Sequence, residues 1–228
     1  MINTIRMLPP ISDAKGEYES APIDCIECTQ QARRYRFPPN FFFPFVALWD
    51  LPGFDSEAFP TDTYFQNPHI MLYAFDCLIL VVGARLKNSD LKLLEEAKQW
   101  NMPVLLVVNQ CDRSIEGEKR KQIARGRRPL TEEEYREIMD NTVQRIKSRI
   151  QEQINRPAEI DIYCVSALTE RWAEGFTSST DTITDASTAS TDGKYDEEAL
   201  RKTYFSSQFI ELCSRCTELA VERRLQRR

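Results

Sequence analysis

Short continuous apolar runs alternate with amphipathic stretches along the chain, and this alternation constrains the fold more than any other feature. Uninterrupted apolar runs of this length are typical of strands buried on both faces of a parallel sheet. The alternation predicts an α/β fold with a mostly parallel sheet flanked by helices. The runs are FDCLILVVGA (75–84), PVLLVVNQ (103–110) and DIYCVSA (161–167), and FFFPFVALWD (41–50) reads as a strand or as two pieces broken at Pro44.

Amphipathic patterns between these runs predict the helices. Residues 89–100 have a helical pattern, with Ser89 as the expected N-cap. Residues 131–154 form a long amphipathic pattern that opens on a capping box of Thr131 and Glu134.

The remaining segments set the expected domain organisation. Residues 9–40 are polar and punctuated by proline, which predicts an irregular loop. The stretch TSSTDTITDASTASTDG (177–193) is rich in Ser, Thr and Asp and has almost no bulky apolar residues, so we expect it to be disordered and dispensable for the core. A final helix is expected from about Asp196 to Arg224. The predicted organisation is a partial domain over 1–176, a disordered loop over 177–193 and a C-terminal helix within 194–228 that completes the domain.

Composition and charge narrow the classes of function. The chain has 228 residues, 42% of them hydrophobic, and a formal net charge of −5, which argues against a nucleic-acid-binding surface. No apolar run reaches the ~18 residues of a membrane span, and MINTIRMLPP does not resemble a secretory signal. We therefore expect a cytoplasmic protein with reduced cysteines. Its basic end, ERRLQRR, fits either a solvated helix end or a peripheral contact with an acidic surface of internal membranes.

Two C-x-x-C pairs, Cys25/Cys28 and Cys213/Cys216, have a spacing that zinc sites use. The pairs lie far apart in sequence and lack the flanking residues of a zinc knuckle. Cys213 and Cys216 also lie one helical turn apart on the apolar side of FIELCSRCTELA, which favours buried structural cysteines over zinc.

Three polar elements stand at the carboxyl ends of predicted strands, where ligands bind in open α/β sheets. In the first, the carboxylate of Asp50 can hold a water on Mg²⁺, and Gly53 allows its backbone N–H to approach a terminal phosphate. In the second, Asn109-Gln-Cys-Asp112, an aspartate can accept two hydrogen bonds from the N1–H and N2–H₂ edge of guanine. The third is Ser166-Ala167, a turn of small residues whose backbone N–H can meet the guanine O6.

Each element also has an ordinary structural explanation. Asp50-Leu-Pro-Gly53 can be a plain exit from a strand into a turn, and Asn109 and Asp112 can cap a helix or turn. The order and spacing of the three elements at three strand ends nevertheless favour a guanine-nucleotide site.

At these residues the sequence resembles the immunity-related, interferon-inducible GTPases. The resemblance is carried by ALWDLPGFDSEAFPTDTYF and GARLKNSDLKL and covers roughly residues 1–170. It implies a P-loop GTPase-like fold that binds GTP or GDP with Mg²⁺. It also implies slow hydrolysis and nucleotide-dependent self-association through the nucleotide face. The implied nucleotide contacts are Asp50 (to Mg²⁺ through water), Gly53, Asn109, Gln110, Asp112, Ser166 and Ala167.

Several positions depart from the family pattern. Gln110 stands where the family usually has a lysine whose aliphatic stem packs on the base, so nucleotide affinity should be lower. Phe54 cannot orient an attacking water, which agrees with slow unaided hydrolysis. The first switch aligns Ile23 with a Mg²⁺-contacting threonine, with Thr29 six residues later. In the same alignment Glu27 matches a glutamate that acts with Gly53 in catalysis, at the nucleotide-bridged dimer interface.

The chain contains no phosphate cradle of the form G-x-x-x-x-G-K-[ST]. In the family this cradle is followed at once by a helix that begins like MINTIR, so we expect the chain to be a fragment that begins just after the cradle and lacks the first strand. The alternative is a pseudo-GTPase that keeps the fold as an interaction module without hydrolysing GTP. An unrelated Rossmann-like enzyme is disfavoured because no glycine-rich dinucleotide loop is present.

Overall fold

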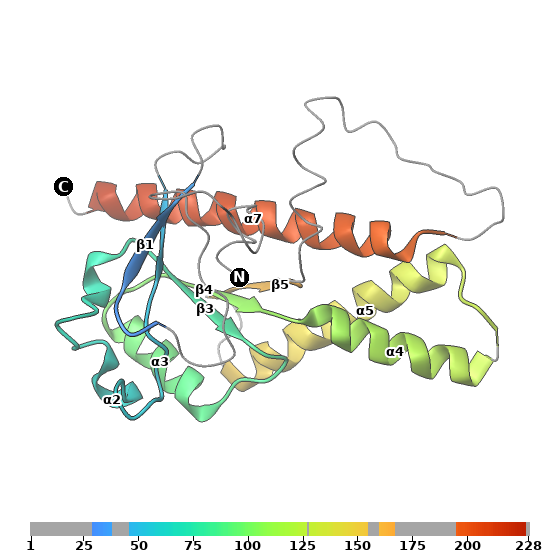
Figure 1. The fold of residues 1–228 in the computed structure, drawn as a ribbon, viewed down its shortest axis with the longest axis horizontal. Helices are drawn as coiled ribbons and strands as arrows, with labels where there is room; N and C mark the ends of the chain where they lie inside the picture. Colours follow the sequence, from blue (N-terminus) through green and yellow to red (C-terminus); the bar gives the residue numbers. More distant parts are fainter. Residues whose placement is uncertain (1–28, 38–45, 127, 155–159, 167–194, 227–228) are drawn as a thin grey trace.

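The computed structural model describes residues 29–37, 46–126, 128–154, 160–166 and 195–226 (Figure 1). The helix expected to begin at MINTIR, the loop expected at 177–193, and residues Ile23, Glu27 and Ala167 lie outside these ranges.

The centre of the fold is a parallel sheet. Its strands, in the order β3-β4-β5, are β3 (Leu78–Val82), β4 (Val104–Val108) and β5 (Asp161–Cys164). The ladders pair Leu80 with Leu106, and Val108 with Cys164. The three apolar runs therefore form the predicted parallel strands, and the fold is α/β as expected.

Alternate residues of β4 face different helices, which explains why its run is continuously apolar. Leu105 and Val107 pack with β5 and with helix α7 (Glu197–Gln226) in one core cluster. Leu106 and Val108 pack on the opposite face with the helices α3 (Asn88–Gln99) and α5 (Glu132–Ile154) in a second cluster. Figure 1 shows these two layers, with α7 along one side of the sheet and α3 and α5 on the other.

A second, antiparallel sheet joins β1 (Arg33–Arg36) to β2 (Ala47–Asp50), with Arg33 opposite Asp50. The prediction that residues 9–40 are irregular was wrong at β1. Three of its four residues are arginines and only Tyr35 is buried, so its sequence carries no apolar run, and pairing with β2 defines the strand. Within the described ranges, no ladder joins β2 to β3.

The remaining elements connect these layers. Helix α4 (Cys111–Gly126) follows β4 directly and packs along α5, and the short α2 (Thr61–Tyr64) and η1 (Leu72–Ala74) lie between β2 and β3. The expected N-cap of α3 was wrong. The cap is Lys87, whose backbone N–H donates to the Asp90 carboxylate at 2.7 Å, while Ser89 is a buried residue of the first turn.

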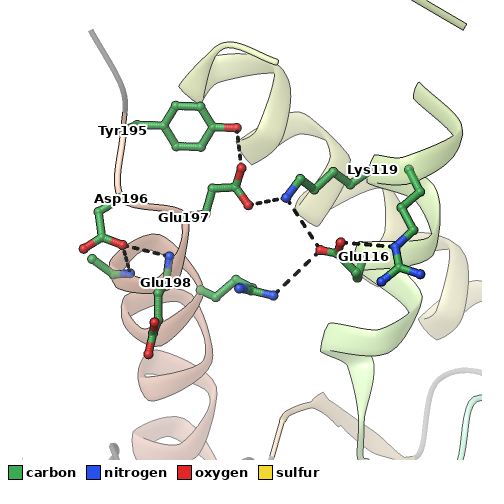
Figure 2. Close-up of polar contacts among 9 residues, drawn as sticks. Glu116, Lys119, Tyr195, Asp196, Glu197 and Glu198 are labelled. Atoms are coloured by element: carbon green, nitrogen blue, oxygen red, sulfur yellow. Dashed lines mark hydrogen bonds and ion pairs between the residues drawn. The ribbon is translucent and has the colours of Figure 1, made fainter. Parts of the chain in front are cut away.

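A polar cluster fixes the start of α7 against α4 (Figure 2). The Lys119 ammonium pairs with Glu197 and lies 3.7 Å from Glu116, and Tyr195 donates to Glu197 at 3.4 Å. The Asp196 carboxylate caps α7 by accepting from two backbone N–H groups at 3.0 Å each. The beginning of α7 near Asp196 agrees with the sequence expectation.

The capping box of α5 is confirmed. The Thr131 hydroxyl accepts from the Glu134 N–H at 3.3 Å, and the Glu134 carboxylate accepts from the Thr131 N–H at 2.9 Å. Thr131→Ala removes one half of this box and is expected to lower the free energy of unfolding by about 1 kcal/mol. Urea unfolding checks the value. Thr203→Ala is the matched control, because the Thr203 hydroxyl bonds only a carbonyl within α7 and alanine favours that helix.

Candidate nucleotide site

The Asn109–Asp112 element is held between the carboxyl ends of β3 and β5 by its own backbone. The Asn109 N–H donates to the Val82 carbonyl at 2.9 Å, and the Cys111 N–H donates to the Val165 carbonyl at 3.1 Å. The Val165 N–H in turn donates to the Val108 carbonyl at 2.8 Å. The element therefore sits where ligands bind in parallel α/β sheets, and α4 begins within it.

Asp112 and Ser166 meet at this edge. The Ser166 hydroxyl donates to Asp112 Oδ1 at 2.6 Å, and both side chains are buried. Asp112 Oδ2 has no hydrogen-bond partner among the residues that the structure describes. A buried carboxylate with one oxygen fixed and the other available is suited to accept from a ligand's N–H groups.

This pairing adds a role for Ser166 that the sequence did not suggest. From the sequence, the Ser166-Ala167 turn is expected to offer a backbone N–H to the base, and that remains a prediction, because Ala167 lies outside the described ranges. The structure shows that the Ser166 hydroxyl orients Asp112. Because Val108 is opposite Cys164 in the parallel register, residues a few positions beyond each strand come together.

Gln110 has an unusual backbone conformation for a residue other than glycine. Its φ is 62°, in the left-handed region, and its side chain is exposed. Its N–H donates to the Asn109 side-chain oxygen at 2.8 Å, and its carbonyl accepts from the Arg113 N–H at 3.2 Å. Strained backbone of this kind costs of order 1–3 kcal/mol and is concentrated at functional sites, which supports a ligand site here.

Asp50 is the last residue of β2, and its carboxylate is hydrogen-bonded. The Thr29 hydroxyl donates to Asp50 Oδ2 at 2.6 Å. The sequence alignment placed Ile23 at the magnesium-contacting position of the first switch. The contact instead favours Thr29, which precedes the strand paired with β2. The antiparallel β1–β2 pairing brings the two side chains together.

Oxygen donors of this kind fit Mg²⁺, which binds through one or two carboxylates, a substrate phosphate and several waters. Asp50 and Thr29 are the residues that would hold it. Among the described residues, no group of three or more His, Cys, Asp or Glu side chains is placed to hold a metal ion.

The loop after Asp50 is fixed by Tyr64. Its buried hydroxyl donates to the carbonyl of Pro52 at 2.6 Å, and its ring packs edge-on against Phe54 at 5.8 Å. Burial, and secondarily the charge of Asp50, raises the pKa of Tyr64 well above its usual value, so the phenol keeps its proton and stays a donor. Gly53 remains exposed between these anchors. Tyr64 lies in the family motif, but no role for it could be predicted from the sequence.

Tyr64→Phe is expected to destabilise the protein by about 1–3 kcal/mol, because it leaves the buried Pro52 carbonyl without its donor. Thermal or urea unfolding measures the change. Tyr195→Phe is the control: its hydroxyl makes only a long 3.4 Å contact with a part-exposed carboxylate, so the cost should be about 0.5 kcal/mol or less. Equal losses in the two variants would contradict a specific role for the Tyr64 hydroxyl.

The structure thus joins two of the three predicted elements directly. Asp112 and Ser166 are in contact, whereas Asp50 lies in the other sheet. Glu27 and Ala167 are outside the described ranges and keep the status of predictions.

An α/β domain with a parallel sheet and these elements at its strand ends has the fold of the P-loop GTPases. A sequence model of the interferon-inducible GTPase family (IIGP) matches residues 1–169. Since this match covers well over half of the chain, the protein belongs to that family, and the family resemblance found in the sequence is confirmed.

Individual relatives agree with the family assignment. Interferon-inducible GTPase 1 of Mus musculus is 27% identical over 117 residues, which is 51% of this chain and 26% of that protein. Interferon-gamma-inducible GTPase 10 of Mus musculus is 28% identical over 104 residues, 46% of this chain and 24% of that protein. Immunity-related GTPase family M protein 2 of the same organism is 27% identical over 114 residues, 50% and 26% respectively. The matched stretch therefore spans about a quarter of the length of these relatives.

None of the described helices combines the length and apolar character that crossing a bilayer requires.

Proposed function

We propose that this chain is part of a GTP-binding protein that holds GTP or GDP with Mg²⁺ and hydrolyses GTP slowly. The observation that carries the proposal is the buried Asp112–Ser166 pair at the carboxyl ends of β4 and β5, with Asp112 Oδ2 available. Guanine offers two adjacent N–H donors to such a carboxylate, whereas adenine does not. Asn109 and Gln110 complete the base-binding element, together with the turn at Ser166 and Ala167.

The Asp50 loop forms the phosphate end of the proposed site. When bound there, Mg²⁺ would supply neutralisation of the negative charge on the phosphate oxygens. Asp50 would hold a water of that ion, Thr29 would supply a hydroxyl oxygen, and the backbone N–H of Gly53 would approach the terminal phosphate. Phe54 packs on Tyr64 and offers no group that could orient an attacking water. Slow turnover is the consequence, with acceleration on self-association through the nucleotide face, where Glu27 acts.

The cellular setting is part of the same proposal. The protein works in the cytoplasm and makes peripheral contact with internal membranes, for which the basic end of α7 is the candidate surface. Support comes from the basic sequence ERRLQRR.

A pseudo-GTPase that uses the fold for protein interaction is the second candidate. Specific observations favour it: Phe54 and Gln110 depart from the residues that assist hydrolysis and base stacking. In this alternative the Asp112–Ser166 pair would serve only to join β4 to β5.

One comparison separates the two functions. The 228-residue chain and a protein extended at its N-terminus by the sequence encoded upstream are each titrated with a fluorescent GTP analogue, with and without Mg²⁺. The proposal expects Mg²⁺-dependent binding in the extended protein, because a cradle supplies backbone N–H donors and a lysine for the phosphates. If both proteins fold cooperatively and neither binds GTP, the pseudo-GTPase is preferred.

A further inference from the structure

Two thiols meet where α7 passes the start of β3. Cys77 directly precedes β3, and Cys216 lies on α7. Cys77 packs against the core cluster that contains Cys216, and the side chains of the two thiols interact. Both cysteines are free thiols, so two sulfurs far apart in the sequence are in contact in the fold.

Contacts near the C-terminal end of α7 hold this helix to the sheet independently of the sulfurs. The Arg224 guanidinium of α7 pairs with Asp76, the neighbour of Cys77, at 2.9 Å. Arg223 donates to the carbonyl of Asn101 at 2.6 Å, just before β4. The course of α7 along the sheet in Figure 1 agrees with these contacts. The two thiols therefore stay next to each other while α7 is docked on the sheet.

The two thiols differ in the way that redox-active pairs differ. Cys77 is partly exposed, whereas Cys216 is only 7% exposed. The interaction with the Cys216 side chain lowers the pKa of Cys77, and the positive charge of Arg223 acts in the same direction, against burial and Asp76. A thiol that is accessible, inclined to ionise and next to a second thiol is the usual arrangement of an oxidation-sensitive cysteine.

We propose that Cys77 and Cys216 form a redox-sensitive pair that a hydroperoxide converts into a disulfide joining β3 to α7. The Cys77 thiolate attacks hydrogen peroxide, so that an S–O bond forms, the O–O bond breaks and the departing hydroxide takes up a proton to leave as water. The Cys216 sulfur then loses its proton and attacks the Cys77 sulfur. The S–S bond forms, the S–O bond breaks and a second water leaves. Two thiols are oxidised, and one peroxide is reduced to two waters.

The expected effect of the disulfide is on stability. The disulfide would join a cysteine just before β3 to a cysteine in the last helix. A cross-link that closes so long a loop strongly lowers the conformational entropy of the unfolded chain. Since α7 covers one face of the sheet, the oxidised protein would keep this helix docked under conditions in which the reduced protein loses it. Oxidative conditions would thus favour the assembled domain.

The chain supplies its own controls. The side chains of Cys111 and Cys164 also interact, but they are 1% and 0% exposed, on the opposite face of the sheet. Cys213 lies one turn from Cys216, and burial raises its pKa to about 11. Accessibility to oxidant therefore predicts reaction at Cys77 first. Proximity alone would predict that the Cys77–Cys216 and Cys111–Cys164 pairs are oxidised equally.

The test uses the full chain treated with a small excess of hydrogen peroxide, then alkylated and mapped by mass spectrometry of its peptides. The expected product is a Cys77–Cys216 disulfide, with a melting temperature at least about 5 °C above that of the dithiothreitol-reduced protein. Cys213→Ser should keep both the disulfide and the shift. Cys77→Ser should lose both, and in Cys216→Ser a dimedone probe should trap sulfenic acid at Cys77.

The peptide map of the unsubstituted protein decides the matter even if a variant folds poorly. A disulfide between other cysteines, or an unmodified Cys77 after peroxide treatment, would overturn the assignment. So would a disulfide at Cys77–Cys216 that leaves the melting temperature unchanged, because the proposed stabilisation would then be absent.

Discussion

Asp112→Asn is expected to shift base preference from guanine toward xanthine. The carboxylate accepts from N1–H and the exocyclic amine of guanine, and xanthine carries a carbonyl in place of that amine. In the variant, Oδ1 can keep the 2.6 Å contact with the Ser166 hydroxyl, while the amide NH₂ takes the place of Oδ2 and donates to the xanthine carbonyl. Hydrogen bonds to charged groups contribute about 1.5–3 kcal/mol, so the preference should change by roughly 10- to 100-fold.

This change is measured by competition of labelled GTP against XTP. The protein used is the N-terminally extended one, in which a phosphate cradle is expected. Ser166→Ala is the matched control, because it frees Asp112 from its partner without altering the acceptors that face the base. It should weaken binding of both nucleotides and leave their ratio nearly unchanged. An Asp112→Asn variant that folds and still prefers GTP would remove the assignment of Asp112 to the base.

The sequence predicted most of the parallel sheet because burial on both faces demands a recognisable pattern. Leu105 to Val108 are all nearly inaccessible, and only a continuous apolar run satisfies that requirement. The start of α5 was equally predictable, because Thr131 and Glu134 bond each other locally and need no tertiary partner.

Elements defined by long-range pairing could not be predicted in the same way. Strand β1 is mostly arginine, and it exists because β2 supplies its ladder. Helix α4 buries only Cys111, Asp112 and Ile115 along its 16 residues, so its apolar periodicity is too weak to recognise. Packing along α5 stabilises this helix, and the apolar pattern of the sequence does not reveal that packing.

The same distinction holds for the candidate site. Its residue types and their positions at strand ends could be predicted, since Asp50, Asn109 and Asp112 each follow an apolar run. The residues that form hydrogen bonds with Asp50 and Asp112 could not be predicted. The Ser166 hydroxyl reaches Asp112 through the β4–β5 register, and Thr29 reaches Asp50 through the β1–β2 register. Register is set by the hydrophobic patterns of both paired strands and by their connection, so the pattern of one segment alone does not reveal it.

Asp50→Asn should abolish most of the Mg²⁺ dependence of GTP binding in the cradle-containing protein. The substitution removes the negative charge that would hold a magnesium-bound water, yet the asparagine oxygen can still accept from the Thr29 hydroxyl. The loop after β2 should also keep its anchor, because Tyr64 bonds Pro52 independently of Asp50. The ratio of GTP affinities with and without Mg²⁺ is therefore expected to fall by about 10-fold or more, with little change in melting temperature.

Two further variants separate this effect from a general loss of charge. Asp62 lies in α2, after the Asp50 loop, and its exposed carboxylate pairs with Lys92. Asp62→Asn removes this carboxylate and should leave the Mg²⁺ response intact. Thr29→Val removes the hydroxyl and should lower the response, whereas Thr29→Ser should preserve it. Retention of the full Mg²⁺ response in folded Asp50→Asn would show that Asp50 has no part in the metal site. The hydrogen bond between Thr29 and Asp50 would then serve only to join the start of β1 to the end of β2.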